Sequence, residues 1–100
     1  MSNAIYYVSF KLKKNASIPD FLLAAEKLNN EFISKQKGYV SWQQLQDGET
    51  WADIITFDSM EALENFKNVS SNPTDTALAF YSFINLPSCK MNAFSVERSY

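Results

Sequence analysis

A single carboxylate lies within an apolar stretch of this 100-residue chain. Asp53 belongs to the run from Trp51 to Phe57, and strand alternation places it on the same face as Trp51, Ile55 and Phe57. A carboxylate among apolar side chains needs a hydrogen-bond donor or acquires a raised pKa, because burial disfavours its charged form. The sequence therefore predicts Asp53 as a catalytic proton acceptor or a ligand-orienting group. The alternative is a structural role, in which Tyr, Trp or backbone donors bind Asp53 and only stabilise the sheet.

Several aromatic and hydroxyl side chains could form a pocket around this carboxylate. Aromatic walls with a few polar groups are typical of sites for small, flat hydrophobic molecules. The candidate ligand-binding residues are Tyr7, Ser9, Trp42, Trp51 and Tyr81. Core packing is the alternative for each of them, since aromatic side chains dominate the cores of small domains.

Other chemistries lack the residues they need. The chain has no His and only one Cys, Cys89, without a CxxC partner, so a catalytic thiol is not expected. No His, one Cys and scattered carboxylates also provide no metal-ligand pattern. The sequence predicts neither a metal site nor a cofactor.

The charge and hydropathy patterns bear on the partners and the compartment. Nine Lys and Arg residues stand against eleven Asp and Glu residues, and the longest basic cluster is Lys11, Lys13 and Lys14. This pattern argues against nucleic-acid binding. No apolar run approaches the roughly 18 residues of a membrane span, and no basic-then-apolar leader is present. The expectation is a protein of the cytoplasm without a membrane or nucleic-acid partner.

The periodicity and the turn signals divide the chain into four expected strands and three expected helical segments. Ser17 and then Asp58 or Ser59 are the expected caps of two amphipathic helices, and Asn72 is expected to cap a helical segment that starts at Pro73. The expected elements are a strand over 5–12, a helix from 18 toward Gly38, strands over 39–46 and 51–57 joined at Asp47-Gly48, helices over 60–69 and 73–84, and a strand over 91–98. This order predicts an α+β, ferredoxin-like βαββαβ fold with a four-stranded antiparallel sheet and helices on one face.

The predicted hairpin is apolar on both faces, so helices can cover only one of them. One hundred residues form a single domain, 1–100, and burial against a second subunit would add to its small core. A homodimer is therefore expected. Ser2-Asn3-Ala4 is similar to an expression-vector scar, and residues 1–4 are expected to be tag-derived or disordered.

The chain resembles the dimeric α+β barrel superfamily, and within it the antibiotic-biosynthesis-monooxygenase-like (ABM-like) domains. The resemblance is carried by the segment 51–62, WADIITFDSMEA, together with 38–41, GYVS, and the pair Asn72-Pro73. It implies a homodimer whose open sheet faces meet, and a pocket between the sheet and the helices of each subunit. The absence of His departs from the haem-degrading members and argues against a haem role.

Two functions of different classes follow. The first is a dimeric barrel protein that binds a small hydrophobic or aromatic molecule without turnover. The alternative is a cofactor-independent monooxygenase or isomerase-like enzyme in which aromatic walls position the substrate and Asp53 accepts a proton. The absence of His, the usual base at neutral pH, favours the first.

Overall fold

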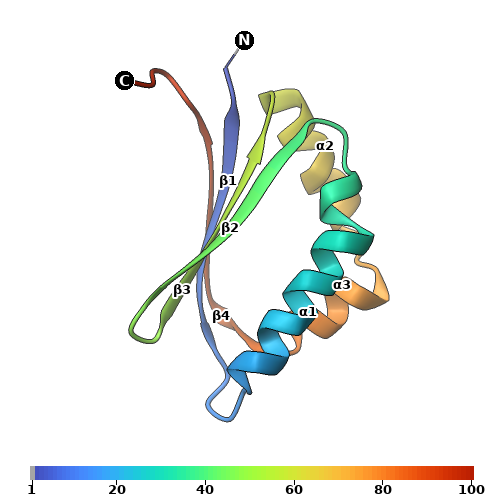
Figure 1. Cartoon of the computed structure of the whole chain (residues 1–100), viewed down its shortest axis with the longest axis vertical. Helices are drawn as coiled ribbons and strands as arrows, with labels where there is room; N and C mark the ends of the chain where they lie inside the picture. The colour runs from blue at the N-terminus through green and yellow to red at the C-terminus, as the bar shows by residue number, and fades with distance from the viewer. Residues whose placement is uncertain (1) are drawn as a thin grey trace.

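The computed structural model, which describes residues 2–100, contains one antiparallel sheet with all helices on the same side of it (Figure 1). The elements in order are β1 (Ala4–Leu12), α1 (Ile18–Glu31), a 3-10 turn η1 (Ile33–Lys35), β2 (Tyr39–Asp47), β3 (Thr50–Phe57), α2 (Met60–Ser70), α3 (Asp75–Tyr81) and β4 (Ile84–Ser95). The strand order is β2-β3-β1-β4. This arrangement confirms the predicted ferredoxin-like α+β fold.

Polar side chains cap the N-termini of the helices. Ser17 accepts a hydrogen bond from the backbone N–H of Asp20, and Ser59 accepts one from Ala62 in the same way. Both caps agree with the sequence prediction. The predicted start of the third helix is wrong, because α3 begins at Asp75 and the cap is the hydroxyl of Thr74.

The end of α1 also differs from the prediction. The helix stops at Glu31 and is followed by η1, so Gly38 does not directly follow the helix as expected. Gly38 instead leads into β2 with φ +81°, and a Cβ at this position would lie 2.5 Å from Ala62 Cβ and from Asp58 Oδ1. Glycine is required there by both the backbone conformation and the close approach of α2.

The β2–β3 turn lies one residue later than predicted. Asp47 pairs with Thr50, which leaves Gly48 and Glu49 as the two turn residues. Gly48 has φ +60°, and no other residue type in the described chain has positive φ. These values match a type II′ turn, whose first central position favours glycine.

The last strand starts earlier than predicted. In the structure α3 ends at Tyr81, and β4 begins at Ile84. The strand includes Pro87, although proline lacks the N–H group that a strand ladder needs. The pairing with β1 is irregular here, and the Ser88 hydroxyl accepts a hydrogen bond from Lys11 N at 2.8 Å and donates one to Asn85 O at 2.6 Å. The Ser88 hydroxyl thus links β4 to β1 where the regular backbone pairing is interrupted. Proline is tolerated here because β4 is an edge strand.

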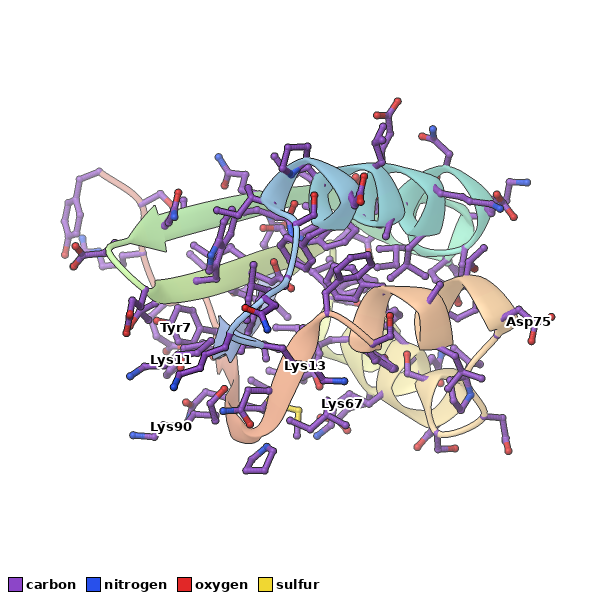
Figure 2. The ribbon with its side chains drawn as sticks, turned by 90° about the horizontal axis from the view of Figure 1, so that it is seen from below. Tyr7, Lys11, Lys13, Lys67, Asp75 and Lys90 are labelled. Atoms are coloured by element: carbon purple, nitrogen blue, oxygen red, sulfur yellow. The ribbon has the colours of Figure 1, made fainter. Side chains whose placement is uncertain are left out.

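The two faces of the sheet have different surroundings. On β3, the side chains of Trp51, Asp53, Ile55 and Phe57 are buried beneath the helices, as the alternation predicted. Among the described residues 2–100, the opposite face carries no helix (Figure 1), and Figure 2 shows Tyr7 pointing away from the helices.

The start of the chain belongs to the sheet from Ala4 onward. Ala4 is fully buried and pairs with Phe57 on one side and Ser95 on the other. The expectation of disorder over 1–4 is therefore wrong for Ala4, and Met1 lies outside the residues that the structure describes.

Candidate functional site

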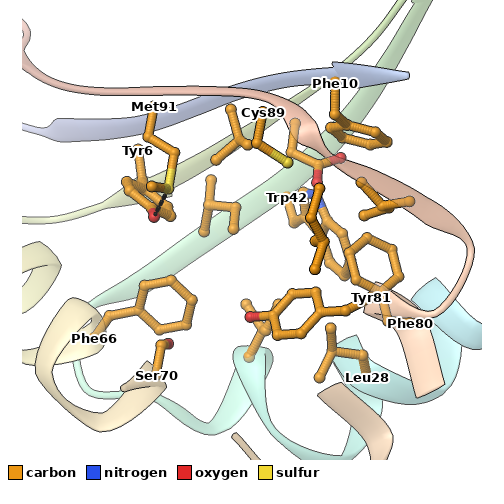
Figure 3. A pocket seen from close by; sticks show the side chains of 16 residues that line it. Tyr6, Phe10, Leu28, Trp42, Phe66, Ser70, Phe80, Tyr81, Cys89 and Met91 are labelled. Carbon is orange, nitrogen blue, oxygen red and sulfur yellow. Dashed lines mark hydrogen bonds between the residues drawn. The ribbon is translucent and has the colours of Figure 1, made fainter. Parts of the chain in front are cut away.

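A cavity of about 420 Å³ lies between the inner face of the sheet and the helices (Figure 3). Its walls are mainly apolar and aromatic, and the rings come from β1, β2, α2 and α3. The aromatic lining residues are Tyr6, Phe10, Trp42, Phe66, Phe80 and Tyr81. The lining also includes Leu86 and Met91 of β4, which are more than half exposed, so the cavity reaches the surface beside this strand.

Asp53 is the carboxylate of this cavity. It is 5% exposed and lies on β3, between Gln44 of β2 and Val8 of β1 in the strand register. Gln44 Nε2 donates a hydrogen bond to Asp53 Oδ1 at 3.2 Å. The central position in the sheet places the carboxylate on the floor of the cavity, with one amide donor beside it.

Burial raises the pKa of Asp53 from 3.8 to about 6, because an apolar environment disfavours the carboxylate anion. The Gln44 hydrogen bond opposes this rise, and the Trp42 indole opposes it too. The buried Nε1 of Trp42 nevertheless forms no well-aligned hydrogen bond in the described part of the chain, so its effect is a weak one. Asp53 can therefore gain or lose a proton close to neutral pH.

Three weaker acids share the cavity with Asp53. Burial raises the pKa of Tyr6, Tyr81 and Cys89, and the charge of Asp53 raises the pKa of Tyr81 and Cys89 further. The phenols and the thiol thus remain protonated at neutral pH, and the Tyr6 hydroxyl donates to Met91 Sδ at 2.9 Å. A protonated thiol is a poor nucleophile.

The structure brings together some of the predicted site residues. Asp53, Trp42 and Tyr81 all line the cavity. Tyr7 and Ser9 lie on the opposite face of the sheet, where Tyr7 packs edge-on to Phe94 at a ring distance of 6.5 Å.

Trp51 lies on the inner face, but it is buried against Phe21, with ring centroids 5.2 Å apart, and is not part of the cavity wall. The prediction that Tyr7, Ser9 and Trp51 line the pocket is therefore wrong for this cavity. Trp51 fills the core because its ring meets the α1 side chain directly.

Sequence reasoning missed Tyr6, Gln44 and Met91. Antiparallel pairing aligns Val8 with Asp53, so Tyr6 and Val8 share the face of Asp53 while Tyr7 and Ser9 do not. Strand alternation separates these two sets, but the sequence alone does not show which set faces the helices.

Within residues 2–100, no group of three or more His, Cys, Asp or Glu side chains could hold a metal ion. None of the helices described is long and apolar enough to cross a membrane.

Solved structures with the same architecture come from several bacteria. SnoaB, a cofactor-independent oxygenase from Streptomyces nogalater, superimposes with a TM-score of 0.74 at 13% identity, over 99% of this chain and 97% of SnoaB. A Bacillus cereus protein assigned as an antibiotic biosynthesis monooxygenase gives 0.63 at 20% identity, over 100% and 98% of the two chains. Protein NE2512 of unknown function from Nitrosomonas europaea gives 0.68 at 18% identity, over 100% and 94%.

The chain shares the ferredoxin-like α+β fold of these proteins. No protein-family model matches its sequence. No curated protein matches it significantly. Because the identities to these solved structures are low, the similarities establish the architecture and not the activity.

Proposed function

We propose that this chain binds a small hydrophobic, aromatic molecule in the cavity around Asp53. The observation that carries the proposal is a space of about 420 Å³ with aromatic walls and one buried carboxylate. Ligand pockets typically range from about 300 to 1,000 Å³, whereas ordinary packing leaves few voids larger than a water molecule. The rings of Trp42, Phe66 and Tyr81 offer apolar surfaces, and Asp53 offers a polar group that can orient the ligand.

Filling the cavity should weaken this binding. Val8 lines the cavity and neighbours Asp53 in the register, so Val8→Phe places an added ring in the ligand space. We expect Val8→Phe to weaken binding of the neutral probe 2-naphthol at least about tenfold, as measured by calorimetry at pH 7.5. The unfolding midpoint should change little, because the cavity can hold the added side chain.

The matched control is Val40→Phe, which introduces the same ring at a half-exposed position of β2 outside the cavity. It should bind 2-naphthol as the wild type does. Unchanged probe affinity in Val8→Phe would contradict the proposal. Mass spectrometry of the purified protein under native conditions offers an independent check for a retained hydrophobic molecule.

A cofactor-independent oxygenase or isomerase-like activity is the second candidate. It is favoured by the pKa of about 6 at Asp53, since a general base works best when its pKa lies near the operating pH. The fold is also shared with SnoaB, a cofactor-independent oxygenase. In this function Asp53 would accept a proton from an electron-rich substrate held against the aromatic walls. Turnover that falls about 10²–10⁴-fold in Asp53→Asn, with substrate affinity retained, would distinguish this enzyme from a binding protein.

We further propose that the helix-free face of the sheet joins two copies of the chain in a homodimer. The centre of this face carries mainly apolar side chains, with Ile5 and Tyr7 on β1 beside Ile54 on β3. Phe94 and Leu45 extend it on the outer strands and are about half exposed. An unpaired apolar face of this kind is typical of protein–protein interfaces.

Sedimentation equilibrium at micromolar concentration should therefore give twice the protomer mass of 11.4 kDa. The interface should bury roughly 2,000 Å² or more in total, the range of obligate dimers. Ile54→Lys should dissociate the dimer, because it introduces an ammonium at the centre of the buried face. Glu49→Lys, at the exposed hairpin turn, adds the same side chain away from this face and should remain dimeric. A monomeric wild type would contradict the proposal.

A further inference from the structure

The ionisable side chains that line the cavity are all acids. Tyr6 comes from β1, Asp53 from β3, Tyr81 from α3 and Cys89 from β4. None of the lining residues in the described chain is Lys or Arg, and the sequence contains no His. An anionic ligand would therefore meet a carboxylate without a compensating cation, so the cavity discriminates against anions.

The carboxylate of Asp53 has spare capacity to accept hydrogen bonds. An ionised carboxylate offers about four acceptor sites, whereas Asp53 receives one hydrogen bond, from Gln44, within the described residues. The Trp42 indole is close enough to favour the charged form without a well-aligned bond. The folded protein therefore holds a buried negative charge that a ligand with charged N–H donors would stabilise.

The walls around Asp53 suit a cation as well. Trp42 and Tyr81 both line the cavity, and Figure 3 shows both rings in the space beneath β4. Aromatic faces attract ammonium groups, most strongly where water is excluded. These rings would replace part of the hydration that an amine loses on entry, while the apolar surfaces contact the rest of the ligand.

The geometry points to a cavity that selects a molecule with a protonated amine on an aromatic body, and that places the amine against Asp53. This inference rests on the proposed ligand-binding function and specifies the charge of the ligand. An ammonium donates to the free acceptor sites of Asp53, and its aromatic body occupies the cavity between Trp42, Phe66 and Tyr81. The exposed side chains of Leu86 and Met91 mark the side from which such a molecule enters.

The test compares three probes that share an indole ring and differ in the charge of the side chain. Tryptamine is a cation at pH 7.5, tryptophol is neutral and indole-3-acetate is an anion. Calorimetry should show tryptamine binding at least about tenfold tighter than tryptophol, and indole-3-acetate at least about tenfold weaker than tryptophol. Binding of tryptamine no tighter than tryptophol, or binding of the acetate as tight as tryptophol, would overturn the inference.

Asp53→Asn removes the negative charge of the site and keeps its shape nearly unchanged. The variant should bind tryptophol as the wild type does and lose the preference for tryptamine. Asp47→Asn removes the same charge at an exposed position at the end of β2 and should keep the preference. A tryptamine preference that survives in Asp53→Asn would overturn the placement of the amine.

The wild type at pH 5 provides a second measurement that needs no variant. Tryptamine remains protonated there, whereas Asp53 takes up a proton below about pH 6, so the preference for tryptamine over tryptophol should shrink. The neighbouring Tyr6, Tyr81 and Cys89 are protonated at both pH values and Gln44 does not titrate, so Asp53 is the cavity group that changes. A preference unchanged from pH 7.5 to pH 5 would overturn the inference.

The outcomes also separate this inference from the proposed function. Binding of 2-naphthol or tryptophol without a preference for tryptamine contradicts the charge selection and leaves the ligand site standing. Failure of 2-naphthol and all three indole probes to bind contradicts both.

Discussion

Asp53→Asn should stabilise the folded protein by about 3 kcal/mol at pH 8 and change its stability little below pH 4. The physical reason is the rise in the pKa of Asp53 from 3.8 to about 6, which burial causes. At 1.36 kcal/mol for each pH unit of difference, the buried anion destabilises the fold by about 3 kcal/mol. Asparagine has nearly the same shape and keeps an oxygen that can accept the Gln44 hydrogen bond, but it carries no charge.

The sign of the pH dependence follows from proton binding. Below pH 3.8 the carboxyl group is protonated in both the folded and the unfolded chain, so it contributes no difference. Between pH 3.8 and about 6 the folded chain keeps a proton that the unfolded chain has released, so the stability of the wild type falls as the pH rises. Above about pH 6 the loss is complete, and the advantage of Asp53→Asn reaches its full size.

Urea titrations at pH 4 and pH 8, at one fixed protein concentration, measure this effect for both proteins. Asp47→Asn is the matched control, because it removes an exposed carboxylate and should show no comparable gain at pH 8. If Asp53→Asn instead lost more than about 2 kcal/mol and bound ligands normally, Asp53 would have a structural role. If Asp53→Asn is more stable than the wild type and has lost the preference for tryptamine, Asp53 is retained for function at the expense of stability.

The face on which Asp53 lies could be predicted because it depends only on the two-residue period of a strand. The partners of Asp53 could not, because they depend on the register between strands. The pairing of Val8 with Asp53 places Tyr6 in the cavity and Tyr7 outside it, and a shift of one residue would exchange them. That register depends on packing against the helices, and no local pattern in β1 predicts this packing.

The sequence predicted a helix start correctly where a Ser hydroxyl caps the helix. Ser17 and Ser59 cap their helices as expected, since each hydroxyl reaches an N–H three residues later. At the third helix several candidates compete, and Thr74 is the cap rather than Asn72. The last strand was expected from residue 91, but β4 begins at Ile84. The Ser88 hydroxyl bonds to β1 across the irregular pairing, a long-range contact that the sequence does not reveal.

Phe21→Ala should give the largest loss of stability in this chain, about 3–5 kcal/mol, the range typical of a buried Phe replaced by Ala. Phe21 is fully buried on α1 and contacts rings from three other elements. Its ring stacks on Phe80 of α3 at 5.1 Å and meets Trp51 of β3 and Phe10 of β1 edge-on at 5.2 and 6.0 Å. Removing it takes away ring contacts that join α1 to α3 and to two strands of the sheet.

The matched control is Leu23→Ala, since Leu23 lies on the same helix and is 64% exposed, and its loss should be below about 0.5 kcal/mol. Phe21→Ala should also weaken 2-naphthol binding, because Phe80 forms part of the cavity wall and packs edge-on against Trp42 at 5.6 Å. With Phe21 gone, Phe80 can move toward the vacated space and leave the wall less well ordered. Urea titration and calorimetry on the two variants test both effects. A loss below about 1 kcal/mol would show that the core closes around the missing ring and that α1 is held to the sheet by other contacts.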